Sequence, residues 1–154
     1  MRKVLLFIGL NLLIFQVNAQ TDDANNDWNL VQKTLNLYLD GMGTSDSIKV
    51  SKSFHDSWQL KYFEDDNINI IKKPKYLERF DSAPHAKSAK WSGRIVFIDI
   101  TNTVAVAKVE ISTTKLLFTD YFNLTKTSDG WYIVDKISTR SPHRTLETPT
   151  ASAK

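Results

Sequence analysis

The 154-residue chain contains no cysteine and only three histidines. Without cysteine there is neither a disulfide nor a thiol nucleophile, so packing alone must hold the fold, which suffices for a domain of this size. His55, His85 and His143 lie far apart, and none forms a ligand pair at helical or hairpin spacing. The sequence therefore gives no support for a metal site or a cofactor, and we predict neither.

A strong net charge is also missing. The chain has 20 Lys and Arg against 17 Asp and Glu, and two of the basic residues, Arg2 and Lys3, lie in a segment that we expect to be removed. Lys72, Lys73 and Lys75 form the only tight basic cluster, and a solvated helix start explains it. This near balance does not favour nucleic acid as a partner.

The first 19 residues have the three parts of a secretory signal: a basic start, an apolar run over residues 4–15, and Val17-Asn18-Ala19 before a cleavage site. Twelve residues of helix rise about 18 Å, well short of the roughly 30 Å hydrocarbon core of a bilayer. The pattern therefore predicts cleavage after Ala19, no stable membrane anchor, and a secreted or periplasmic protein whose domain spans residues 20–139.

Helices and strands follow one another in a simple order. Apolar residues recur at spacings of three and four from Trp28 to Met42, which predicts a helix. A short second helix is expected from residue 45 or 46 to about residue 53, and Pro74 suits the first turn of a third helix over residues 74–80. Alternating residues predict a hairpin of two strands, over 58–63 and 68–71.

The last third of the domain is expected to be all strand. Four further strands are predicted over residues 91–100, 104–112, 116–126 and 131–138. Their short connections predict an antiparallel meander. Residues 140–154 contain two prolines and small polar residues, which predicts a disordered tail. The order favours an α+β domain in which a strongly curved antiparallel sheet is covered on one face by three N-terminal helices.

Several sequence strings resemble the putative lumazine-binding family of the nuclear transport factor 2-like (SnoaL-like) superfamily. They include YLDG at residues 38–41, IDITNTVAVAKV at 98–109, DYFNL at 120–124 and GWYIVDKI at 130–137. The resemblance covers about residues 27–139 and implies a cone-shaped, cystatin-like α+β fold that often forms homodimers. The superfamily includes isomerases, dehydratases, polyketide cyclases, binding proteins and dimerisation modules, so fold alone does not give function.

The ketosteroid isomerases of this superfamily allow a test for catalysis. They use a tyrosine on the first helix, a second acidic group, and a carboxylate that moves the proton. By their spacing, Tyr38 falls at the tyrosine, Asp120 near the second acidic group, and Tyr62 at the base. A phenol, with a pKa of about 10, is a poor base at neutral pH. We therefore expect no isomerase chemistry of this kind.

The surroundings of Asp120 can be estimated from strand register. If Lys126 pairs with Trp131 across the last turn and the register continues, Asp120 lies among apolar residues and Lys136 lies on the opposite face of the sheet. A carboxylate in apolar surroundings requires a partner. Lys108, on the neighbouring strand, is expected to face it.

These observations favour a small-molecule binding protein whose ligand is partly apolar and flat, because aromatic walls accommodate flat rings. The residues expected to contact the ligand are aromatic, with one carboxylate as polar anchor: Tyr38, Phe54, Trp58, Tyr62, Phe80, Trp91, Phe122 and Asp120. Two alternatives stay open. The first is a cyclase, dehydratase or isomerase that uses Asp120 or His55, although His55 can equally cap the preceding helix. The second is a homodimeric interaction module with a filled cone.

Export is directly testable. Protein recovered from the medium or periplasm of the native host is expected to begin at Gln20, because Ala19 is the small residue that closes the signal. Intact mass spectrometry measures this. Recovery of the uncleaved chain in the membrane fraction would instead identify residues 1–19 as an anchor.

Overall fold

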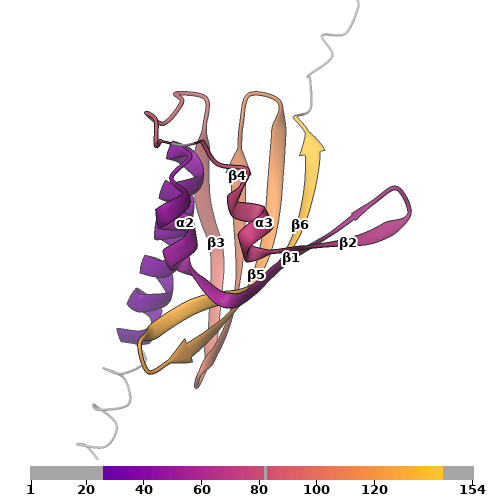
Figure 1. Ribbon diagram of the computed structural model, residues 1–154. Helices are drawn as coiled ribbons and strands as arrows, with labels where there is room; N and C mark the ends of the chain where they lie inside the picture. The colour runs from indigo at the N-terminus through magenta and orange to yellow at the C-terminus, as the bar shows by residue number, and fades with distance from the viewer. Residues whose placement is uncertain (1–25, 82, 144–154) are drawn as a thin grey trace, which may run out of the picture.

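The computed structural model describes residues 26–81 and 83–143, and shows one curved sheet with helices against one of its faces (Figure 1). Residues 26–44 are helical and form the first helix. The elements that follow are α2 (Ser47–Ser53), β1 (Phe54–Glu64), β2 (Asn67–Lys72), α3 (Lys73–Leu77), β3 (Ser92–Thr101), β4 (Val104–Ser112), β5 (Leu116–Thr127) and β6 (Gly130–Pro142). The predicted α+β architecture is confirmed.

The six strands form a single sheet in the order β2-β1-β6-β5-β4-β3. The predicted meander of β3 to β6 is present, and each of its neighbouring pairs is antiparallel. The hairpin of β1 and β2 joins this meander through a parallel pairing of β1 with β6, in which Lys61 faces Ile137. The sequence pattern did not predict this parallel pair, which brings the hairpin beside the end of the meander.

Local chemistry explains where the helices begin and end. The Asp46 carboxylate accepts hydrogen bonds from the backbone N–H groups of Ile48 and Lys49, both at 3.0 Å, and so caps the start of α2. A Cβ atom on Gly41 would lie 2.6 Å from Cγ2 of Val50, so glycine permits the close contact between the first helix and α2. Pro74 lies in the first turn of α3, as predicted, but the helix ends at Leu77 rather than at residue 80.

The core lies between the helices and the inner face of the sheet. The first helix contributes Val31, Leu35 and Tyr38, all fully buried, at the spacing that the sequence predicted. Trp28, expected on the same face, is 44% exposed. Inward-facing residues of β4 alternate with exposed ones, as expected for a strand with one buried face. The helices therefore cover one face of the sheet and leave the other face open.

The predicted boundary of the tail was wrong by three residues. Strand β6 continues to Pro142, and its last residues pair with the start of β5: Arg140 with Phe118, and Pro142 with Leu116. The reason is that β5 is long enough to provide a partner for each of them. The rest of the expected tail, residues 144–154, and the expected signal segment, residues 1–19, lie outside the described residues. Within the described ranges, no helix is both long and apolar enough to span a bilayer.

The end of β6 should matter for stability. A chain that ends after Thr139 loses the strand pairs of residues 140–142, whereas a chain that ends after His143 keeps them. We expect the shorter chain to unfold at a temperature lower by about 3 °C or more. Thermal unfolding followed by circular dichroism compares the two. Equal melting temperatures would show that these pairs contribute nothing.

Candidate functional site

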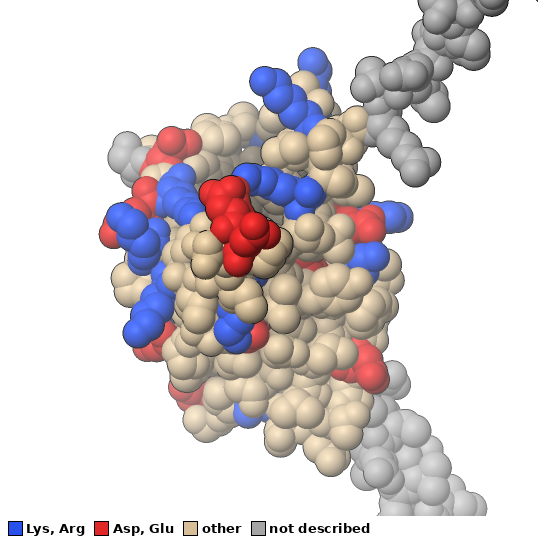
Figure 2. Space-filling view, turned by 90° about the vertical axis from the view of Figure 1, so that its right-hand side faces the viewer, with Lys and Arg blue, Asp and Glu red and all other residues tan. Residues whose placement is uncertain are grey.

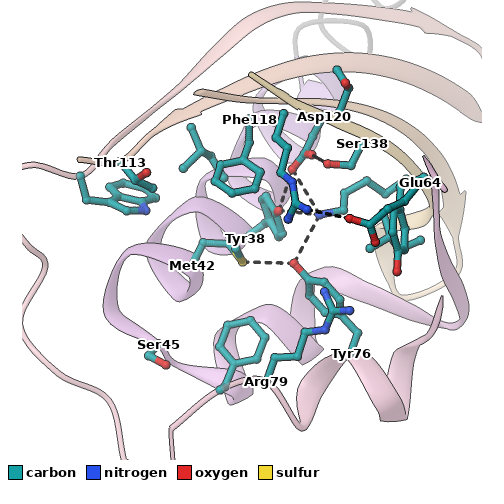
Figure 3. Close-up of a pocket in the computed structure, with 18 of the residues that line it drawn as sticks. Tyr38, Met42, Ser45, Glu64, Tyr76, Arg79, Thr113, Phe118, Asp120 and Ser138 are labelled. Carbon is teal, nitrogen blue, oxygen red and sulfur yellow. Dashed lines mark hydrogen bonds and ion pairs between the residues drawn. The ribbon is translucent and has the colours of Figure 1, made fainter. Parts of the chain in front are cut away.

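A cavity of about 680 Å³ lies between the helices and the sheet (Figure 3). This volume falls within the range of about 300–1,000 Å³ that is typical of small-molecule sites. The first helix, β1, the α3 region, the β4–β5 hairpin and β6 contribute its walls. Its lining includes Tyr38, Met42, Leu60, Tyr62, Phe63, Glu64, Tyr76, Arg79, Phe80, Trp91, Ile111, Phe118, Asp120, Lys136, Ser138 and Arg140.

A buried ion pair lies in the wall of this cavity. Nζ of Lys136 is 3.3 Å from Oδ2 of Asp120, and the two side chains are only 4% and 2% exposed. Removing two charges from water is costly, so such a pair is stable only where further hydrogen bonds satisfy the remaining donors and acceptors. Here they do.

Three hydroxyl groups complete the network around the pair, as the dashed lines in Figure 3 show in part. The Tyr38 hydroxyl donates to Oδ2 of Asp120 at 2.9 Å, and the Ser138 hydroxyl donates to Oδ1. The Lys136 ammonium donates to the phenol oxygens of Tyr38 and Tyr76, at 3.1 and 3.3 Å. With its contact to Asp120, each of the three ammonium N–H groups therefore has an acceptor.

The protonation states follow from this arrangement. Burial, and next the charge of Asp120, raise the pKa of Tyr38 well above its ordinary value. For Lys136, burial is the largest influence and favours the neutral amine, but Asp120 and Tyr76 together outweigh it and raise the pKa. Lys136 is thus an ammonium ion and Tyr38 a neutral phenol at neutral pH. Neither acts as a general base or a nucleophile there.

The predicted register around Asp120 was wrong, because the β5–β6 pairing shifts by one residue between Asn123 and Leu124. Beyond this irregularity Asp120 faces Ser138 and Phe122 faces Lys136. A shift of one residue moves a side chain to the other face of a strand. Lys136 therefore points to the core, contrary to prediction.

The expected partner of Asp120 was wrong as well. In the β4–β5 pairing it is Val109 that faces Asp120, while Lys108 faces Tyr121 on the outer side of the sheet. Lys108 instead forms an ion pair with Glu110 at 3.3 Å. Lys136 takes the place that the sequence analysis gave to Lys108.

Tyr76 is a site residue that sequence reasoning missed. It is the one buried residue of α3, and its hydroxyl donates to Sδ of Met42 at 3.4 Å. A tyrosine soon after a helix-starting proline was the available signal, but the period of so short a helix does not indicate which face is buried. Tyr76 brings α3 into the network.

Charged side chains surround the outer part of the cavity. Glu64, at the end of β1, forms an ion pair with Arg140 of β6 at 2.8 Å. The Arg79 guanidinium lies over the ring of Tyr76, 5.5 Å from its centre. Sequence analysis missed all three residues. On the face shown in Figure 2, towards which the β1–β2 hairpin projects in Figure 1, basic and acidic side chains lie side by side.

Five of the eight residues predicted to contact a ligand line the cavity: Tyr38, Tyr62, Phe80, Trp91 and Asp120. The other three do not line it. Phe54 and Trp58 stack on each other with ring centres 4.0 Å apart, and Phe122 packs edge-on against Tyr38 at 5.0 Å. All three are at most 2% exposed and fill the core. Ligand contact by the five remains a prediction.

His55, the other catalytic candidate, lies elsewhere. It lines a second cavity of about 360 Å³ together with Tyr132, and its Nδ1 atom is 2.8 Å from the Ser57 hydroxyl. It neither reaches the main cavity nor caps α2. The described residues hold no group of three or more His, Asp or Glu side chains placed to bind a metal ion.

A strongly curved sheet closed by N-terminal helices around an inner cavity defines the nuclear transport factor 2-like fold, which is also described as cystatin-like. Within this class the chain belongs to the putative lumazine-binding family, whose model matches residues 26–138. No curated protein matches the chain.

Three solved structures illustrate the similarity. The chain is similar to a nuclear transport factor 2-like protein of unknown function from Shewanella baltica OS155, with 25% identity, 76% of this chain and 95% of that chain covered, and a TM-score of 0.68. A second, from Methylobacillus flagellatus KT, has 28% identity, coverage of 75% and 93%, and a TM-score of 0.63. A ketosteroid isomerase-like protein from Erwinia carotovora atroseptica SCRI1043 shares the fold at 14% identity, with coverage of 79% and 99% and a TM-score of 0.56.

The buried pair can be tested by a double-mutant cycle. Lys136→Met leaves the buried Asp120 carboxyl group without its ammonium partner, so we expect the free energy of unfolding to fall by about 3–5 kcal/mol. Asp120→Asn should also destabilise. The double variant should lose less than the sum of the two single losses, because no buried charge remains uncompensated.

Urea unfolding of the four proteins measures this coupling. Lys108→Met is a matched control, because it breaks the ion pair with Glu110 in the more exposed part of the sheet and should cost less than about 1 kcal/mol. Strict additivity of the Lys136 and Asp120 variants would contradict the account.

Proposed function

We propose that this protein binds a small, partly apolar, flat ligand in its cone and does not convert it chemically. The observation that carries the proposal is the open cavity of about 680 Å³ with aromatic side chains in its walls and a fully satisfied polar network beside them. A volume of this size argues against the alternative in which the cone is filled by its own side chains.

The aromatic walls support a flat ligand. Tyr62, Phe80 and Trp91 line the cavity and are each only partly buried, so their faces remain available to a ligand. Flat rings gain both apolar burial and favourable ring–ring geometry against such walls. Lumazine, the heterocycle in the family's description, has this shape, which supports the class of ligand.

The carboxylates of the cavity support binding rather than turnover. Asp120 accepts hydrogen bonds from Tyr38, Lys136 and Ser138, so both of its carboxylate oxygens already have partners within the protein. Glu64 is paired with Arg140. Tyr62, at the position where isomerases place their base, supplies only a phenol. His55 is outside the cavity.

The proposal includes export and pairing of two copies, as the sequence and the family resemblance led us to expect. The outer face of the sheet supports pairing, because Phe97, Tyr121 and Ile137 lie on it and are 42%, 48% and 54% exposed. They belong to one row across β3 to β6, in which Lys108 of β4 lies between Phe97 and Tyr121. Apolar side chains gathered in this way favour an interface.

Binding can be measured with lumazine as a flat heteroaromatic probe. We expect a saturable change in tryptophan fluorescence, and we expect Trp91→Ala and Phe80→Ala each to weaken binding by about fivefold or more, because each removes a wall of the cavity. Tyr132→Ala, at the second cavity, is the matched control and should leave affinity within about twofold. The opposite result, loss in the control alone, would move the site to the second cavity.

Turnover needs a separate assay. A 3-oxosteroid incubated with the wild-type protein should isomerise at the background rate, since a positioned general base typically contributes about 10²–10⁴-fold and the described cavity has only the phenol of Tyr62 where the isomerases place their carboxylate. Enzymatic isomerisation by the wild type that Asp120→Asn abolishes would show that the protein is an enzyme.

A further inference from the structure

The two tyrosine hydroxyls of the network are used differently. Tyr38 donates its proton to a carboxylate, the strongest acceptor available to it. Tyr76 donates only to the Sδ atom of Met42, at 3.4 Å, and a thioether is a weak acceptor. The hydroxyl of Tyr38 therefore already has a strong acceptor within the protein. The hydroxyl of Tyr76 has only a weak one, so a ligand oxygen would be a better acceptor for it.

Lys136 makes Tyr76 a stronger donor. Its ammonium group donates to the phenol oxygen of Tyr76 at 3.3 Å, and a hydroxyl that accepts a hydrogen bond from a cation gives its own proton more readily to another acceptor. The chain of contacts therefore runs from Asp120 through Lys136 to Tyr76, and it ends at a lining residue of the cavity. The last residue of this chain of contacts, Tyr76, thus carries a polarised O–H group whose acceptor is Sδ of Met42, another residue that lines the cavity.

Arg79 adds positive charge at the same place. Three basic and two acidic residues line the cavity. Lys136 is paired with Asp120 and Arg140 with Glu64, whereas Arg79 has no carboxylate partner among residues 26–81 and 83–143. Tyr76 and Arg79 are three residues apart at a helical end, so their side chains share one face, and the guanidinium lies over the phenol ring.

We infer that the ligand is an aromatic anion, such as an aromatic carboxylate, sulfonate or enolate, whose charged oxygen is bound by the Tyr76 hydroxyl and the Arg79 guanidinium. This inference rests on the proposed function and adds the chemical class of the ligand. Phe80 lies beside Tyr76, with ring centres 5.8 Å apart, and lines the same cavity as Trp91. The residues proposed to bind the charged oxygen therefore lie next to an aromatic side chain that can contact the flat ring of the ligand.

A matched pair of dyes tests whether a negative charge on the ligand strengthens binding. Anilinonaphthalenesulfonate and N-phenylnaphthylamine differ only by the sulfonate, and both fluoresce when they enter an apolar site. We expect the wild-type protein to bind the sulfonate at least about tenfold more tightly, which corresponds to one good charge-assisted contact. Arg79→Gln and Tyr76→Phe should each weaken sulfonate binding by about five- to tenfold and leave the neutral dye within about twofold.

Two control variants test whether an effect comes from the loss of any positive charge or from binding outside the cone. Lys75→Gln removes a positive charge from α3 at an exposed position paired with Glu78, and should leave both affinities unchanged. Tyr121→Ser, on the outer face of the sheet, reports binding outside the cone. Arg79 is exposed, so Arg79→Gln should fold normally even if Tyr76→Phe lowers stability.

Met42→Leu distinguishes a ligand-binding role of Tyr76 from a structural one. The change conserves volume but removes the acceptor that competes with the ligand. We expect the sulfonate to bind more tightly, by about two- to threefold, because the hydroxyl no longer gives up a bond on binding. A merely structural Tyr76 predicts unchanged or weaker binding.

The outcomes are distinct. Equal binding of the two dyes, each unaffected by Arg79→Gln but weakened by Trp91→Ala, would overturn this inference and leave the proposed function in place. Binding of neither dye, or binding that Tyr121→Ser abolishes and Trp91→Ala does not, would overturn both.

Discussion

The burial of one ammonium–carboxylate pair, Lys136 with Asp120, constrains the rest of this structure. Two charges that are almost completely removed from water are tolerated only when every donor and acceptor is satisfied. Tyr38 on the first helix and Tyr76 on α3 meet this requirement, although they lie 98 and 60 residues away from Lys136 along the chain. The first helix, α3, β5 and β6 are therefore all positioned relative to one point.

The same constraint shapes the function. Because the pair and its hydroxyls are hydrogen-bonded to one another, this wall of the cavity is a fixed set of charges and dipoles. A preorganised polar surface lowers the cost of binding, since little has to be rearranged when a ligand arrives. Phe80 and Trp91 supply apolar area nearby. This arrangement is the physical basis of the proposal that the cone recognises a polar oxygen on a flat ring.

The fold could be predicted from sequence because its signals are local: helical spacing after Trp28, proline at the start of α3, and short connections within the meander. The site could be predicted only in part. Tyr38 and Asp120 stood out by their positions, but Lys136 did not, because an irregularity between Asn123 and Leu124 shifts the register by one residue. Aromatic identity does not distinguish side chains that fill the core, such as Trp58, from those that line a cavity. The parallel pairing of β1 with β6 is non-local and leaves no sequence pattern.

The most direct test of the account is a crystal structure of the protein with bound anilinonaphthalenesulfonate. The account predicts the dye inside the cone, with a sulfonate oxygen within hydrogen-bond distance of the Tyr76 hydroxyl and the Arg79 guanidinium, and with the contacts between Tyr38, Asp120 and Lys136 unchanged. A dye bound on the outer face of the sheet, beside a cone filled by its own side chains, would contradict it.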